Sequence, residues 1–207
     1  MIVATNLNIY APDGRLLLHD LTFRIGTGCR SAFCGPNGCG KSTLLRHIAG
    51  LEPQPRNLVR DISLVDIAYL PARPLDLLLP WGSVARNISF FLTAKPSTEL
   101  GSLSEFFAEV EYAPGNMERF LNTEVYKLSS GQQTILAVYC ALARSPRLLV
   151  ADEIFSTLSA PLRTSVAKKI LSLNLPIACS SHDMDFIENL EASVISLDTH
   201  IASDSQS

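Results

Sequence analysis

The sequence has few charged residues and no long apolar run, and each shortage excludes a class of protein. Charged residues make up 18% of the 207 residues, and the net charge is −3. Without an excess of basic charge there is no general attraction to nucleic acid, so we expect no nucleic-acid partner. No apolar run is long enough to span a bilayer, and the N-terminus lacks the basic start of a signal peptide. We therefore expect a soluble or peripheral protein.

Paired cysteine motifs are also missing. The five cysteines are scattered and form no CxxC pair, which favours a reducing cytosol over a disulfide scaffold or a zinc site. They are Cys29, Cys34, Cys39, Cys140 and Cys179. Hydrophobic residues make up 47% of the chain and the mean hydropathy is +0.20, as in a globular protein with large buried surfaces. The length fits one domain, which we place over residues 1–207.

Short apolar runs alternate with turns and helical patterns along the chain. This alternation predicts an α/β fold with a parallel sheet and an N-terminal antiparallel β part. We expect strands in the segments 6–10, 15–25, 31–34, 63–70, 147–152, 176–181 and 193–198. Helices are expected after Gly40, where Gly50 is the C-cap, and around 161–173. Residues 52–61 are expected to form a loop, and the polar tail 203–207 to fray.

The composition changes between the expected strand 63–70 and the expected strand 147–152. Prolines come first, and then Phe106, Phe107 and Val110 recur at helical spacing. We interpret this region, at about 72–145, as an inserted helical subdomain.

The segment "GPNGCGKS" matches the pattern G-x-x-x-x-G-K-[ST] and lies between an expected strand and an expected helix. Backbone N–H groups of such a loop cradle phosphates, and the helix N-terminus adds its positive dipole. The alternative is a glycine-rich turn with a chance Lys-Ser pair, but the context favours a P-loop NTPase core. The predicted nucleotide-binding residues here are Gly35, Pro36, Asn37, Gly38, Cys39, Gly40, Lys41, Ser42 and Thr43. Lys41 is expected to reach the β/γ-phosphates and Ser42 to ligate Mg²⁺.

Two further strand ends carry polar residues that fit the same site. The run "RLLVADE" ends in Asp152, a candidate Mg²⁺ ligand, and Glu153, a candidate general base. His182 follows the next strand and is a candidate contact for the γ-phosphate. Alone, an acidic pair after a strand is a common helix cap, and a lone histidine is usually structural. The phosphate loop shifts both interpretations towards function, because the ends of parallel strands meet at one edge.

A third motif, "LSSGQQ", begins a densely apolar helix. Ser129 there fits an ordinary helix N-cap. The motif nevertheless resembles the LSGGQ signature of the ATP-binding cassette (ABC) family of ATPases, and it precedes the acidic strand as in that family. The resemblance covers nearly the whole chain and implies ATP and Mg²⁺ as cofactors.

The resemblance also implies residue roles and a dimer. Tyr10 lies where the family has an aromatic that stacks on adenine, and His182 matches the family's switch histidine. Two cassettes face each other head to tail in this family, so the signature residues of one chain would contact the ATP of the other. These residues are Ser129, Ser130, Gly131 and Gln132. We therefore expect a second cassette, identical or different, as a partner.

Three positions depart from the family pattern. The usual glutamine after the strand 63–70 is replaced by Pro71 or Ala72, depending on alignment. Ser159 replaces an aspartate in the loop after the acidic strand, and Ser130 replaces a signature glycine. The in-cis residues remain, so we predict a working but slow ATPase. A low-turnover regulatory or structural subunit stays open.

The absence of coiled-coil heptads and of a second cassette favours a transport subunit over repair or translation members. Such a transport subunit would lie on the cytoplasmic side of the cell membrane and bind transmembrane permease subunits there. The string "LDLLLPWGSVARNISFF" resembles that of bacterial importers for oxyanions, sulfonates or related nutrients. Trp81 is the expected partner contact, although these apolar residues also fit the subdomain's own core. A soluble ABC ATPase without a membrane partner is a further alternative.

Overall fold

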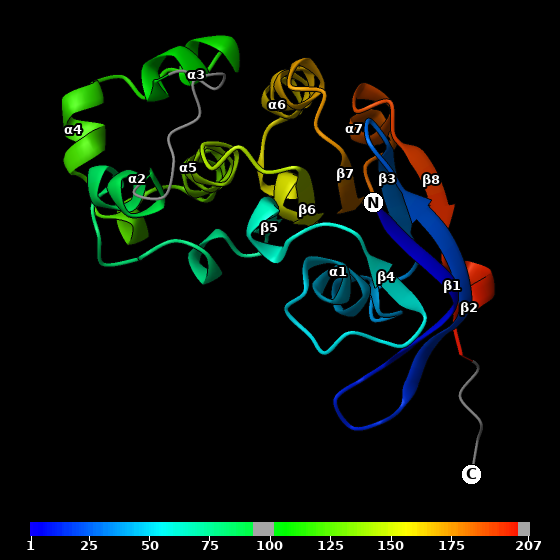
Figure 1. Cartoon of the computed structure of the whole chain (residues 1–207). Coiled ribbons are helices and arrows are strands. Elements are labelled where there is room, and N and C mark those ends of the chain that lie inside the picture. Colours follow the sequence, from blue (N-terminus) through cyan, green and yellow to red (C-terminus); the bar gives the residue numbers. More distant parts are fainter. Residues whose placement is uncertain (93–101, 203–207) are drawn as a thin grey trace.

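The computed structural model describes residues 1–92 and 102–202, and the tail 203–207 lies outside the described residues. Two sheets form its frame (Figure 1). A parallel sheet has the strand order β5-β6-β7-β3-β8, and an antiparallel sheet has the order β2-β1-β4. This arrangement confirms the predicted α/β class with a parallel sheet and an antiparallel β part.

The parallel strands are short, and all except the mostly exposed edge strand β8 are largely apolar, as strands covered by helices on both faces are. They are β3 (Arg30–Cys34), β5 (Ile67–Leu70), β6 (Leu148–Asp152), β7 (Ile177–Ser180) and β8 (Ser193–Ser196). Every residue of β6 and β7 is buried. The helix α1 (Lys41–Ala49) lies on one face, and α6 (Ala160–Ser172) and α7 (Met184–Asn189) lie on the other (Figure 1).

The core is divided between these two faces. One cluster packs α1 against the antiparallel strands β1 (Ile2–Tyr10) and β2 (Leu16–Ile25) and includes Leu44, Leu45 and Ile48. The apolar face of this helix is therefore buried, and Gly50 is its C-cap as expected. The second cluster joins α5 (Ser130–Leu142), α6 and α7 to the opposite face of the parallel sheet.

The helices α2 (Val84–Leu92), α3 (Leu103–Glu109) and α4 (Met117–Asn122) lie to one side of the sheet (Figure 1). Phe106, Phe107 and Val110 are buried there, as their spacing predicts. The α6 helix contacts this region through Lys169, which pairs with Glu109. The helical character expected for about 72–145 is thus present in the described residues, and the subdomain division stays a prediction.

Two predicted segments were wrong in part. Residues 52–61 are not all loop, because β4 (Leu58–Arg60) pairs with β1. The strand expected over 63–70 begins only at Ile67, since Leu64–Asp66 forms a 3₁₀ turn. The helix α7 was not predicted. No described helix is long and apolar enough to cross a membrane.

Candidate functional site

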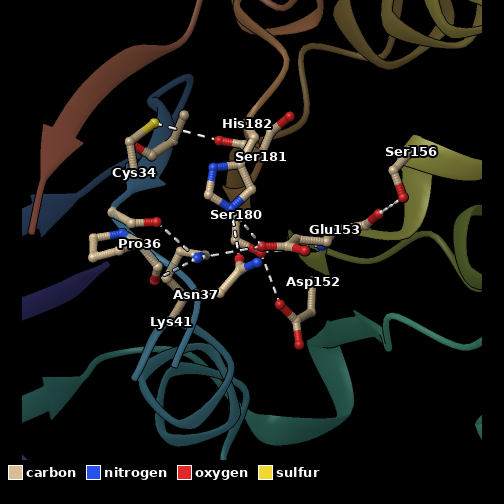
Figure 2. A network of polar contacts seen from close by, with 12 residues as sticks. Cys34, Pro36, Asn37, Lys41, Asp152, Glu153, Ser156, Ser180, Ser181 and His182 are labelled. Atoms are coloured by element: carbon tan, nitrogen blue, oxygen red, sulfur yellow. Dashed lines mark hydrogen bonds and ion pairs between the residues drawn. The ribbon is translucent and has the colours of Figure 1, made fainter. Parts of the chain in front are cut away.

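The carboxyl ends of β3, β6 and β7 meet at one edge of the parallel sheet and carry the predicted in-cis residues. Asp152 pairs in register with Ser180, and Phe33 of β3 pairs with the same serine. The loop 35–40 leaves β3 at this edge and leads directly into α1. The sheet therefore brings together the phosphate loop, Asp152, Glu153 and His182 (Figure 2).

The loop 35–40 has a conformation that only glycine supports at its last position. Gly40 has φ +109°, and a Cβ there would lie 3.1 Å from Leu17 Cβ. The Cys39 N–H donates to the Pro36 carbonyl at 3.3 Å, which folds the loop upon itself. This tight turn presents the start of α1 towards the sheet edge, as a phosphate cradle requires.

Lys41 is 5% exposed, and its ammonium group lies among oxygen atoms. The Nζ atom donates to the carbonyls of Gly35 at 2.8 Å and Pro36 at 3.1 Å. It also lies 3.4 Å from Glu153 Oε1. These contacts compensate the buried charge of Lys41, which lies at the edge of the parallel sheet (Figure 2).

The Glu153 carboxylate is shared by two cationic or donor groups. His182 Nε2 lies 3.2 Å from Glu153 Oε1 and 3.2 Å from Asn37 Oδ1. Both neighbours are acceptors, so the Nε2 nitrogen carries the proton in this arrangement. Lys41, Glu153, His182 and Asn37 therefore form one polar cluster from three different segments (Figure 2).

The backbone at Glu153 leaves the strand abruptly, with φ 47°. Its N–H lies within hydrogen-bond distance of Ser180 Oγ at 3.0 Å and of the Ser180 carbonyl at 3.3 Å. Its carbonyl accepts from the Ser156 hydroxyl at 2.8 Å. These contacts stabilise a left-handed conformation that is unfavourable for a non-glycine residue.

Ser180 was missed by the sequence reasoning. Its hydroxyl donates to Asp152 Oδ1 at 2.7 Å, and Asp152 is only 4% exposed. One serine therefore orients the candidate metal ligand and supports the candidate base. The available signal was its position as the last residue of a strand at the same sheet edge.

The signature residues make contacts mainly within their own helix start. Ser129 caps α5: its hydroxyl accepts from the Gln132 N–H at 3.3 Å, and its N–H donates to Gln132 Oε1 at 3.0 Å. Ser129 and Ser130 are exposed. Gly131 has room for a side chain, since a Cβ added there would lie 3.7 Å from the Thr157 carbonyl oxygen. Within residues 1–92 and 102–202, no hydrogen bond or ion pair joins residues 129–132 to the phosphate loop.

A hydroxyl pair connects α5 to the loop after β6. Thr134 Oγ1 lies 2.7 Å from Thr157 Oγ1, and the Thr157 hydroxyl also donates to the Ile154 carbonyl at 3.2 Å. Thr134 is completely buried. The signature helix is therefore fixed to the segment that follows Glu153 in the same chain.

Comparison with known protein families identifies the family of this chain. The family model described as ABC transporter matches residues 18–156. The chain belongs to the ABC transporter family. The predicted resemblance is thereby confirmed.

Two relatives of this ABC chain are named for import. The Fe(3+) ions import ATP-binding protein FbpC of Mesorhizobium japonicum is 34% identical over 175 residues, which cover 79% of this chain and 47% of that protein. The aliphatic sulfonates import ATP-binding protein SsuB 2 of Pseudomonas syringae pv. tomato is 32% identical over 176 residues, covering 83% and 72%. The chain spans about half the length of the FbpC relatives that it matches.

Solved ABC structures share the fold. The structure of an ATP-binding subunit of an ABC transporter has a TM-score of 0.80 at 22% identity, covering 96% of this chain and 86% of that one. A dimeric ATP-binding cassette in a post-hydrolysis state, bound to ADP and Pi, has a TM-score of 0.74 at 22% identity, covering 96% and 94%. These similarities confirm the predicted P-loop ATPase fold.

Beside the in-cis cluster of this ABC chain lies a cavity of about 770 Å³. Ser42 and Asp152 line one end of it, and Pro71 and Ala72 line its wall where the family glutamine was expected. A serine hydroxyl and a carboxylate are oxygen ligands of the kind that Mg²⁺ prefers, so these residues fit the implied metal. Tyr69 also lines the cavity; burial and the charge of Asp152 raise its pKa to about 12, so it stays a hydrogen-bond donor at neutral pH.

The remaining predicted contacts lie on exposed surfaces of the ABC chain. Tyr10 is 50% exposed at the end of β1, beside His47 in a separate cavity. Trp81 is 70% exposed, whereas Leu78 and Val84 on either side of it are buried. The buried Asn87 side chain accepts from the Leu79 N–H at 2.7 Å and donates to the Ser83 carbonyl at 3.0 Å. The string 75–91 therefore holds both core residues and exposed apolar ones, and Trp81 is more exposed than Leu75 at 37% or Phe90 at 59%.

Proposed function

We propose that this chain binds ATP with Mg²⁺ and hydrolyses it to power import through separate membrane-spanning subunits. The observation that carries the proposal is the Glu153 carboxylate, held between Lys41 and His182 at the sheet edge. Family membership and relatives named as import ATP-binding proteins support the same function.

We assign the residue roles from the positions of the side chains and from the family pattern. Lys41 and the N–H groups at the start of α1 bind the phosphates, and Tyr10 stacks on the adenine. Glu153 takes a proton from the attacking water, and the His182 Nε2–H donates to the γ-phosphate. Ser42 and Asp152 would hold Mg²⁺, which when bound would supply positive charge beside the phosphate oxygens.

A second cassette completes the site in this proposal. The start of α5 offers backbone N–H groups and the Ser129 hydroxyl to the ATP of a partner chain placed head to tail. Because residues 129–132 make no polar contact with their own phosphate loop among the described residues, they are available for such a partner. The neighbouring structure of a dimeric cassette supports this geometry for the fold.

We assign the membrane partner to the surface at Trp81, on the cytoplasmic side of the membrane. The backbone just before the exposed Trp81 contacts the segment at Tyr126, since the Tyr126 N–H donates to the Pro80 carbonyl at 3.0 Å. Large exposed aromatics are the residues most often energetically dominant in interfaces. The companion membrane subunits determine which substrate is imported.

Phosphate release from the purified complex tests the enzyme. We expect Glu153→Gln to lower ATP turnover about 10²- to 10⁴-fold and to trap an ATP-bound dimer. Glu118→Gln, an exposed change on α4, is the matched control and keeps wild-type turnover. A turnover unchanged by Glu153→Gln would overturn the assigned base.

Co-purification from detergent-solubilised membranes tests the partner. Trp81→Ala is expected to release the membrane subunits, and Val65→Ala, an equally exposed apolar residue next to β5, is expected to retain them. Failure of the wild type to co-purify with any membrane protein would favour a soluble ABC ATPase instead.

A low-turnover regulatory subunit is the second candidate function. The observations that favour it are Pro71 and Ala72 in place of the glutamine, and Ser159 in place of the aspartate. In that case the wild type binds ATP, but its phosphate release is no faster than that of Glu153→Gln.

A further inference from the structure

Tyr69 is a candidate for a role in the ATP site that the family pattern does not suggest. It lies on β5 and pairs in register with Val150 of β6. Side chains alternate along a strand, so Tyr69, Val150 and Asp152 lie on the same face of the sheet. This is the face covered by α1, because Val150 belongs to the α1 cluster and Tyr69 packs against it.

The phenol and the candidate metal ligands share one space. Tyr69, Ser42 and Asp152 all line the cavity of about 770 Å³ beside the sheet edge. Burial raises the pKa of the Tyr69 phenol, and the charge of Asp152 raises it further.

Two of the three arginines that line this cavity are already engaged in ion pairs, and the third, Arg144, is exposed. Arg46 pairs with Glu52 at 2.9 Å, and Arg73 pairs with Asp76 at 3.1 Å. In the described part of the chain, the Tyr69 hydroxyl has no hydrogen-bond partner. Pro71 and Ala72, which follow it, carry no side-chain donor.

Among the residues that the structure describes, Asp152 is held from one side only. Ser180 on β7 donates to its Oδ1 atom at 2.7 Å. The neighbouring strand on the other side of β6 is β5, and Tyr69 is its polar residue on this face.

We propose that Tyr69 is a positioning residue whose hydroxyl donates to the second oxygen of Asp152 when metal and nucleotide are bound. Ser180 and Tyr69 then fix the carboxylate from both flanking strands, and the phenol supplies the polar contact that the absent glutamine cannot. This inference rests on the proposed ATPase function. Partners that orient a metal ligand in this way commonly change metal affinity by about tenfold or more.

The test is the affinity for Mn²⁺, measured from the electron paramagnetic resonance signal of the free ion. The protein is saturated with a non-hydrolysable ATP analogue. Tyr69→Phe keeps the ring that packs on the α1 cluster and removes only the hydroxyl. We expect a Mn²⁺ affinity about fivefold to tenfold weaker, with an unchanged melting temperature. Tyr126→Phe, at an exposed tyrosine away from the site, is expected to match the wild type.

Nucleotide affinity in EDTA separates positioning from simple packing. Tyr69→Phe should bind the analogue as the wild type does when no metal is present. An equal loss of affinity with and without metal, or a Mn²⁺ affinity within about twofold of the wild type, would overturn the inference. A wild type that binds no nucleotide would overturn the proposed function as well, whereas a wild type that binds metal and nucleotide normally confines the failure to Tyr69.

Discussion

The two halves of the proposed ATP site are built differently. The phosphate-loop half is buried and is held by contacts between distant segments, with Lys41 5% exposed and Asp152 4% exposed. The signature half is exposed at Ser129 and Ser130 and is held mainly by a local capping box between Ser129 and Gln132. The first half is held together by contacts within one chain, and the second presents an exposed surface that we propose a partner chain covers.

This difference predicts how substitutions act. Changes in the buried half affect ATP binding and folding of the isolated chain, because its groups satisfy one another. Changes in the exposed half leave the chain folded and affect the dimer. The following predictions test that division, beginning with the largest expected effect.

Lys41→Ala is expected to weaken ATP binding most. The substitution removes the charge-assisted hydrogen bonds to phosphate, which contribute about 1.5–3 kcal/mol, or roughly 10- to 100-fold in affinity. Isothermal titration of the isolated chain measures it, with Lys168→Ala as the control because Lys168 is exposed on α6. Unchanged affinity in Lys41→Ala would remove this residue from the site.

Gly40→Ala and Gly131→Ala form a matched pair across the two halves. Gly40 has φ +109° and a close neighbour in Leu17, so alanine should cost about 1–2 kcal/mol of unfolding free energy. Gly131 has helical geometry and room for a methyl group, so its alanine variant should stay within about 0.5 kcal/mol of the wild type.

Urea denaturation of the isolated chain measures both variants, and gel filtration with ATP in a Glu153→Gln background measures the dimer. The Gly131→Ala variant should fold normally and lose the ATP-dependent dimer. Equal destabilisation by both substitutions would contradict the division between a buried and an exposed half.

Ser129→Ala should destabilise the isolated chain by about 1 kcal/mol, because it removes the side-chain cap of α5. Ser159→Ala is the control, since Ser159 is the N-cap of α6 but makes no side-chain cap hydrogen bond. Urea denaturation should therefore separate the two serines. If both variants are equally stable, the capping box contributes little to α5.

Ser130→Gly is expected to have the smallest effect, an increase in turnover of up to about threefold, which corresponds to less than about 1 kcal/mol. The reason is steric: Ser130 places a Cβ where the family has glycine, and in the proposed dimer this Cβ would lie next to the phosphate of the partner's ATP. Phosphate release by the assembled complex measures it. Unchanged turnover would leave Ser130 as an ordinary residue of the first helical turn.

Elements whose signals are local were predicted well from the sequence. The loop 35–40, β6 and α5 carry their glycine, apolar and capping patterns within a few residues, and the structure has a tight loop, a buried strand and a helix at these places. The strand β4 was missed because Leu58–Arg60 is stabilised by pairing with Ile2–Ala4, far away in the chain. The helix α7 was missed because six residues carry too little periodicity to identify.

The contacts of the site were less predictable than its residues. The cluster of Lys41, Glu153 and His182 depends on the order of the strands, which a single sequence does not contain. Ser180 and Tyr69 are common residues in strands, and only the register with β6 places them beside Asp152. The assigned roles of all these residues stay predictions until the variants are measured.

The left-handed backbone at Glu153 has an evolutionary consequence. Branched side chains are poorly tolerated at φ 47°, whereas glutamine and glutamate fit this conformation equally well. A single nucleotide substitution converts a glutamate codon into a glutamine codon. No conformational barrier therefore separates a descendant that hydrolyses ATP from one that only holds it, and mutation can move a lineage between the two in one step.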